Sequence, residues 1–207
     1  MTSHRSWLAA LTLGATLALA PAVAARPVDS ENRAAARALG KEGIALYRQG
    51  KHAEALDRLS RAHAVVGLTT TGLWRAKCLE KLGRLVEAAE QYLQVTRMKP
   101  GDEAPQKHLA AIDEARAARQ DLLPRIPKVR VVARGGGASA AVIRIDGKLV
   151  PAALLGELRP VDPGDHVLVV EHAGEVEEQL FRVAEGQTVE LPVDVSGSAA
   201  AGPPAER

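Results

Sequence analysis

The sequence predicts a two-domain α + β protein: about five helices packed as hairpins, followed by a small all-β sandwich. Two observations lead to this prediction. The first half of the chain repeats itself at an offset of 33 residues, as from Gly50 to Gly83. The hydrophobic period then changes from about 3.6 to about 2 residues beyond residues 124–127. A chain of 207 residues has room for two small domains of this kind.

The N-terminal segment, residues 1–25, is expected to be a secretory signal peptide. A basic start at residues 4–5 precedes an uncharged run over 7–20, and small residues then lead to a cleavage point after Ala24 or Ala25. A retained membrane anchor is the alternative, but a spanning helix needs about 20 apolar residues and this run is shorter. The chain is therefore expected to be exported to the periplasm or cell envelope, or secreted, without a stable membrane span after cleavage.

Helical periodicity extends over residues 30–123. Gly50 and Gly83 are predicted to end the first helix of each hairpin, because a left-handed closing residue is least costly as glycine. Pro100-Gly101 is predicted to end the fourth helix. Acidic side chains at Asp102-Glu103 then favour the start of a fifth helix, to about residue 120, that caps the array.

The region 128–195 is predicted to form a small antiparallel β-sandwich. Asp146-Gly147 is a strong hairpin signal, because both turn positions favour positive φ. Pro192 cannot donate a ladder hydrogen bond, which predicts that the last strand lies at an edge. Residues 124–127 are expected to be a linker and residues 196–207 a disordered tail. The expected strands begin at or near residues 128, 142, 166, 176 and 188.

Small residues recur at matching places in the two helical units, which begin near Ala36 and Thr69. The small positions are Gly43, Ala55, Ala62, Ala76 and Ala88, the large positions are Leu59 and Tyr92, and Pro100 is a closing proline. This pattern resembles the tetratricopeptide repeat family, with departures at Val95 and Gly67. The resemblance implies that the first helices of successive units line a concave groove that binds peptides.

Three segments of the β half resemble a PEGA-type domain, a small transthyretin-like sandwich of exported bacterial proteins. They are Ala141–Gly147, Asp162–Val170 and Val183–Gly186. The family's Gly-x-Thr-Pro stretch is replaced by Leu155–Pro160, and its Gly-Tyr by Ala173–Glu175. Together with the signal peptide and the repeats, the resemblance implies a cell-envelope protein of a Gram-negative bacterium.

The residues that could carry chemistry do not form a recognisable constellation. Asp165-His166 is more typical of a strand start than of a catalytic dyad, and His172 lies too far along the same strand to share a metal with His166. The glycine run at 135–137 lacks the Lys-Ser/Thr of a phosphate loop and predicts a turn. Cys78, the single cysteine, is expected to be a buried apolar residue. No enzyme activity, cofactor or metal is therefore expected.

A basic face on the first and third helices is the candidate binding surface. At about 100° per residue, cationic side chains gather there with an indole, and such a surface suits an acidic or C-terminal peptide. An ordinary solvated face, with Trp74 packed between helices, is the alternative. The predicted peptide groove comprises Arg37, Lys41, Ile44, Tyr47, Arg48, Trp74, Lys77, Lys81 and Lys107.

These observations favour a non-catalytic exported adaptor or scaffold whose repeat groove binds a polypeptide. A cell-wall or polysaccharide-binding module acting through the β domain is the alternative, although Phe181 is the only aromatic residue in that half. Lys and Arg total 27 and Asp and Glu total 25, so the charge balance does not call for a nucleic-acid partner. Self-association through the open end of the short array is a further expectation.

Overall fold

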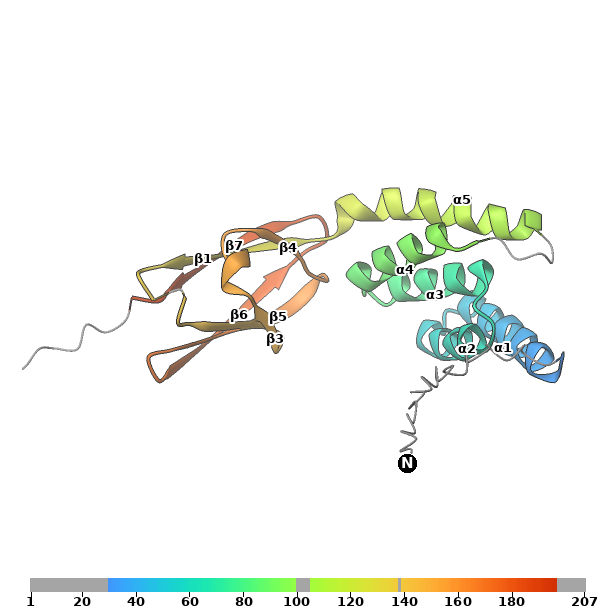
Figure 1. Ribbon diagram of the computed structural model, residues 1–207, viewed down its shortest axis with the longest axis horizontal. Helices are drawn as coiled ribbons and strands as arrows, with labels where there is room; N and C mark the ends of the chain where they lie inside the picture. Colours follow the sequence, from blue (N-terminus) through green and yellow to red (C-terminus); the bar gives the residue numbers. More distant parts are fainter. Residues whose placement is uncertain (1–29, 100–104, 138, 197–207) are drawn as a thin grey trace, which may run out of the picture.

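A helical region precedes a β region in the computed structural model, which describes residues 30–99, 105–137 and 139–196 (Figure 1). The predicted α + β class, with five helices before a two-sheet β region, is confirmed in these residues. The helices are α1 (Ser30–Arg48), α2 (His52–Val65), α3 (Thr69–Lys81), α4 (Leu85–Arg97) and α5 (Pro105–Leu122), followed by a 3-10 turn, Leu123–Arg125. The strands are β1 (Lys128–Arg134), β2 (Val142–Ile145), β3 (Lys148–Val150), β4 (Leu158–Pro160), β5 (Gly164–His172), β6 (Glu175–Val183) and β7 (Thr188–Asp194).

Several predicted features lie outside the described residues. They are the signal peptide over 1–25, the helix end at Pro100-Gly101, the acidic helix start at Asp102-Glu103, and all but the first residue of the tail over 196–207. Within the described ranges, no helix combines the length and the apolar composition that crossing a membrane requires.

The first helices of both hairpins end in the same glycine-closed turn. Gly50 and Gly83 have φ angles of 78° and 75°. The N–H of Lys51 donates to the carbonyl of Leu46 at 3.0 Å, and the equivalent bond after Gly83 has the same length. This six-to-one hydrogen bond closes a helix end in which the glycine is left-handed. The predicted role of both glycines is therefore confirmed.

Small residues let α1 and α2 cross closely. A Cβ atom added to Gly43 would lie 2.6 Å from Cγ of Leu59, so the Leu59 side chain of α2 packs directly against the backbone of α1 at this point. Ala55, Leu59 and Cys78 form a buried cluster beneath this crossing. The prediction that Cys78 is buried is thus confirmed, since its side chain has no exposed surface.

The β region consists of two sheets that share one apolar core. Their strand orders are β4-β1-β7 and β3-β2-β5-β6. Asp146 and Gly147 have φ angles of 49° and 74° in the turn between β2 and β3, as the sequence predicted for a hairpin. The shared core comprises Val129, Val131, Ile143, Ile145, Val150, Leu168, Val170, Leu191, Val193 and Val195.

One strand pairing contradicts the predicted antiparallel sandwich. β1 and β7 run parallel over their whole length, whereas the other strand pairs in the described residues are antiparallel. Parallel neighbours require a long crossover, and five strands lie between β1 and β7 in the sequence. β7 has a neighbour on one side only, so the prediction of an edge strand from Pro192 is confirmed.

Residues 124–127, predicted to be a linker, pack between the two regions. Ile126 is buried in the apolar cluster of α3, α4 and α5. The Arg125 guanidinium donates from Nη1 to Glu80 of α3 at 2.6 Å and from Nε to Glu185, which follows β6, at 2.9 Å. Hydrogen bonds to Glu185 and Glu80 raise the pKa of Arg125 above its ordinary value. One side chain therefore connects the helical region to the β region.

Candidate functional site

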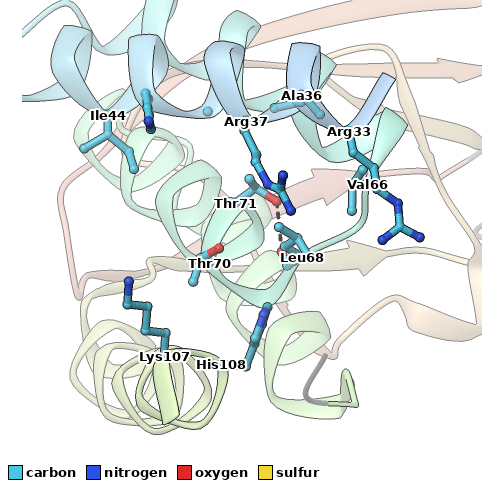
Figure 2. A pocket seen from close by; sticks show the side chains of 13 residues that line it. Arg33, Ala36, Arg37, Ile44, Val66, Leu68, Thr70, Thr71, Lys107 and His108 are labelled. Atoms are coloured by element: carbon cyan, nitrogen blue, oxygen red, sulfur yellow. Dashed lines mark hydrogen bonds between the residues drawn. The ribbon is translucent and has the colours of Figure 1, made fainter. Parts of the chain in front are cut away.

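A groove of about 600 Å³ lies between α1 and α5, over the start of α3 (Figure 2). It contains four of the nine residues of the predicted peptide groove: Arg37, Lys41, Ile44 and Lys107. We call it the basic groove and define it by its lining residues. They are Arg33, Ala36, Arg37, Gly40, Lys41 and Ile44 of α1, Ala62 of α2, Val66 and Leu68 of the following turn, Thr70 and Thr71 of α3, and Lys107 and His108 of α5.

The α1 side of the basic groove is built from two stripes of one helix. Ala36, Gly40 and Ile44 recur every four residues; Ala36 and Gly40 are buried and Ile44 is half-buried, so the backbone of α1 forms part of the apolar floor. A Cβ atom on Gly40 would lie 3.8 Å from Cγ2 of Thr71, which is ordinary contact distance. The floor is thus lined by small and aliphatic groups, without a bulky aromatic side chain.

The rim of the basic groove is positively charged. Arg33, Arg37 and Lys41 follow one another at four-residue spacing along α1, and Lys107 faces them from α5 (Figure 2). Among the described residues that line the groove, none is Asp or Glu. Lys41 and Lys107 are exposed. Four cationic groups around an apolar floor favour a ligand that carries both carboxylates and apolar side chains.

Two threonine–histidine pairs hold the base of the basic groove. The Thr71 hydroxyl donates to the carbonyl of Leu68 at 2.9 Å, so it can only accept from Nδ1 of His63, 2.8 Å away. Burial and the nearby Arg75 lower the pKa of His63, which favours this neutral form. Oγ1 of Thr69 lies 2.7 Å from Nδ1 of His108 and ties α5 to α3.

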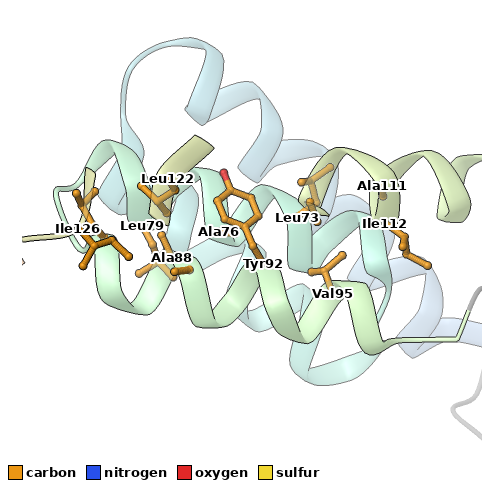
Figure 3. Close-up of a cluster of buried hydrophobic side chains, with 13 residues drawn as sticks. Leu73, Ala76, Leu79, Ala88, Tyr92, Val95, Ala111, Ile112, Leu122 and Ile126 are labelled. Atoms are coloured by element: carbon orange, nitrogen blue, oxygen red, sulfur yellow. The ribbon is translucent and has the colours of Figure 1, made fainter. Parts of the chain in front are cut away.

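The α5 wall of the basic groove is fixed by an apolar cluster below it (Figure 3). Ala111, Ile112 and Ala115 of α5 are buried against α3 and α4, and Tyr92 lies in the middle of this cluster. A helix that buries one stripe in this way has a fixed rotation about its axis. Lys107 lies at the border of this buried stripe, one turn before Ala111, so the packing of the stripe in the core also fixes the position of Lys107 beside α1.

Three of the predicted residues form a separate aromatic cluster beside the basic groove. The rings of Tyr47 and Trp74 meet edge to face at 5.1 Å, and Nζ of Lys77 lies 4.6 Å from the Trp74 ring centroid. Lys77 also forms an ion pair with Glu114 of α5. Tyr47 and Trp74 are half-buried and pack on the cluster of Ala55, Leu59 and Cys78. Trp74 therefore packs between helices, as the alternative interpretation of this face expected.

The predicted surface thus divides into three parts. Arg37, Lys41, Ile44 and Lys107 line the basic groove. Tyr47, Trp74 and Lys77 form the aromatic cluster. Arg48 and Lys81 are exposed at the C-terminal ends of α1 and α3 and do not line the groove.

Sequence reasoning missed part of the basic groove. Arg33 lies one turn before Arg37 on the same helix face, so a longer helical stripe would have included it. Thr70 and Thr71 begin α3, and His108 follows Lys107. Val66 and Leu68 belong to the turn between α2 and α3, whose path over the groove no periodicity predicts.

In the β region, His166 has hydrogen-bond partners on both ring nitrogens. Nδ1 lies 2.7 Å from the carboxylate of Asp146 and Nε2 lies 2.7 Å from the carbonyl of Asp162. Phe181 stacks on the ring at 5.2 Å. Asp165, its sequence neighbour, instead pairs with Arg182. His166 is 8% exposed and both nitrogens are occupied, so this arrangement is structural.

The β region offers little to support a sugar or metal site. Phe181, half-buried beneath His166, does not present an open face for a sugar ring. Among residues 30–99, 105–137 and 139–196, no three His, Cys, Asp or Glu side chains are close enough to hold a metal ion. Comparison with known proteins adds no assignment, since no protein-family model and no curated protein matches this chain.

Proposed function

We propose that this chain is a non-catalytic exported adaptor whose basic groove binds an acidic polypeptide segment. The basic groove itself supports the proposal, because it combines an apolar floor with four cationic rim residues, and none of its described lining residues is acidic. We further propose that the helical region is a short tetratricopeptide-type array and the β region a PEGA-like sandwich, and that the chain acts in the cell envelope.

The position of the basic groove between two helices, with cationic groups on both sides of an apolar floor, suits a peptide segment. A volume of about 600 Å³ accommodates several side chains. The groove lies between two helices, so an extended segment can pass along it. Guanidinium and ammonium groups pair with side-chain or C-terminal carboxylates, and the apolar floor accepts the intervening side chains. The preferred ligand thus alternates acidic and apolar residues.

Binding can be tested with a fluorescein-labelled peptide of alternating Glu and Leu, against the same peptide with Gln in place of Glu. Fluorescence anisotropy should show binding of the first peptide that weakens with added salt, because exposed charges are screened. The charge reversals Lys41→Glu and Lys107→Glu should each weaken binding by about tenfold, or about 1.4 kcal/mol.

The matched controls for these charge reversals are Arg48→Glu and Lys81→Glu. Both make the same change of charge on exposed residues of the same helical region, outside the basic groove. They should change the affinity by less than about twofold, because distant exposed charges are screened. Equal losses in both pairs would show that net charge alone attracts the peptide, and the proposal of a groove ligand would fail.

Export can be tested separately from binding. The full chain, expressed in a Gram-negative host, should be recovered from the periplasm with an N-terminus at Ala25 or Arg26. Recovery of the uncleaved chain from the cytoplasm would contradict export. It would not bear on peptide binding, which the anisotropy experiment tests.

A further inference from the structure

β6 is a long sheet edge that lacks the protection seen at the other edges of the sandwich. β3 and β4 end their sheets with three residues each, and β7 carries Pro192. β6 extends over nine residues, Glu175–Val183, without a proline, and pairs with β5 without a break in register. Short strands and prolines are devices that prevent edge-to-edge pairing. β6 therefore retains a full row of backbone groups on the side away from β5.

The outer face of β6 also carries the two most exposed large apolar side chains of the described residues. Leu180 is 80% exposed and Val176 is 65% exposed, and both lie on the face opposite to Phe181, which packs on the core. The hairpin of β5 and β6 extends away from the helical region (Figure 1). A leucine this exposed on a strand with one free edge is typical of an interaction surface.

We propose that β6 pairs with β6 of a second copy of this chain, antiparallel, with Leu180 of the two copies facing each other at the twofold axis. Two residues directly opposite each other on antiparallel strands place their side chains on the same face of the sheet. In a symmetric dimer the residue numbers of each such pair therefore add up to an even number, and one residue faces its own copy at the twofold axis. With Leu180 at the axis, residues 177–183 of one copy pair with 183–177 of the other.

Charge selects this register among the symmetric alternatives. With Leu180 at the axis, Glu178 of each copy faces Arg182 of the other on the outer face, which gives two ion pairs beside the leucine contact. A twofold axis at Glu177 or Glu178 would place identical carboxylates opposite each other, which is unfavourable. An axis at Gln179 would leave Glu178 facing Leu180, and an axis at Phe181 would leave Arg182 facing Leu180. An axis at Arg182 would place two guanidinium groups opposite each other. Opposite charges directly across two strands stabilise the pairing.

The assembly would join two four-stranded sheets into one continuous sheet of eight strands. An interface of this kind is isologous, the most common type in soluble oligomers. It uses no residue of the basic groove, so both grooves would remain open in the dimer. The proposal therefore does not depend on the proposed peptide ligand.

Sedimentation velocity of the purified chain over a range of concentrations tests the interface. The chain should be a dimer at high concentration, and Leu180→Asp should shift its dissociation constant upward by at least about tenfold. Leu149→Asp is the matched control, because Leu149 is 56% exposed on β3, at the opposite edge of the same sheet. Leu149→Asp should leave the dimer unchanged. A chain that stays monomeric, or an equal effect of both variants, would overturn the proposal.

A charge exchange tests the register. Glu178→Arg and Arg182→Glu should each weaken the dimer, and the double variant should restore it, because the double change rebuilds both ion pairs. Arg182 also pairs with Asp165 at 3.5 Å, but both side chains are about 80% exposed, so this pair contributes little to folding. Circular dichroism should show folded protein in all variants. Failure of the double variant to recover the dimer would overturn the register and with it the proposal.

Discussion

The carboxylate of Asp162 accepts a hydrogen bond from the backbone N–H of Val86 at 2.9 Å, across the boundary between the β region and the helical region. Val86 is the second residue of α4, and the residue before that helix, Arg84, provides no side-chain cap. Asp162 therefore caps α4 although it lies 76 residues after Val86 in the chain. An acceptor at this position satisfies one of the free N–H groups and places negative charge at the positive end of the helix.

Replacing Asp162 should destabilise the contact between the two regions. Asp162→Ala is expected to lower the free energy of unfolding by about 1 kcal/mol, and Asp162→Asn by less, because asparagine also caps helices. Urea titration followed by circular dichroism measures both. Asp113→Ala is the control, since Asp113 is exposed and its ion pair is with Arg116, one turn away on the same helix. A loss from Asp162→Ala no larger than that from Asp113→Ala would contradict the cap.

Gly43 and Gly40 should respond in opposite ways to alanine. Gly43→Ala is expected to cost about 1 kcal/mol or more, because its new Cβ would lie 2.6 Å from Leu59 and overpacking exceeds the gain in helix propensity. Gly40→Ala meets Thr71 at 3.8 Å and should stabilise α1 by up to about 1 kcal/mol. Thermal and urea unfolding of the two variants and of the wild-type chain measure whether each change raises or lowers the free energy of unfolding. Stabilisation by both changes would show that α1 and α2 separate easily.

The stability of the β region should depend on the protonation of His166. Burial lowers the pKa of this imidazole, but the hydrogen bonds to Asp146 and to the Asp162 carbonyl outweigh it, and the net pKa lies above the ordinary 6.5. Both partners accept hydrogen bonds, so the doubly protonated ring satisfies both. A raised pKa in the folded state means that the stabilisation is complete below pH 6.5 and is lost as the pH rises through the folded value.

The unfolding free energy of the wild-type chain should therefore fall as the pH rises above 6.5, and this fall should be reduced in His166→Gln. In Asp146→Asn, which retains a residue suited to the φ of 49°, the pKa of His166 should drop. An NMR titration of the His166 ring measures that pKa directly. An unchanged pKa in Asp146→Asn would show that the carboxylate does not stabilise the imidazolium.

Cys78 should be unreactive in the folded chain. Its side chain has no exposed surface, and burial raises the pKa of the thiol to about 11, so almost no thiolate forms at pH 8. An aromatic disulfide reagent should label the native chain slowly and the urea-unfolded chain at once. Rapid labelling without urea would indicate that α3 opens away from the cluster of Ala55 and Leu59.

Local signals predicted the hairpins and their turns well. Gly50, Gly83 and Asp146-Gly147 act through their own backbone conformation, so their effect can be deduced from a few neighbouring residues. The parallel pairing of β1 with β7 could not be deduced this way, because it depends on how the chain crosses between two sheets. Hydrophobic alternation identifies a strand and its buried face but not the direction of its neighbour.

The sequence predicted the part of the basic groove that lies on one face of α1, but not the part formed by the turn between α2 and α3. The four-residue spacing of Arg37 and Lys41 places them together on α1 whatever the remaining fold is. That Lys107 faces them, and that Lys77 pairs with Glu114, depends on how α5 packs on α3. The hydrogen bonds of His166 join residues from two separate turns, and nothing local in the sequence links them.

α5 has a mechanical role that follows from the packed segment 124–127. Its first turn carries Lys107 and His108 of the basic groove, and its last turn continues through Leu123–Arg125 into β1. A helix of this length spans about 27 Å, at about 1.5 Å per residue. A load on the β region, from a tether to a surface or from a second copy, would therefore act on the helix that forms one wall of the groove. The apolar packing of α5 on α3 and α4 would resist that load and hold the groove at its width.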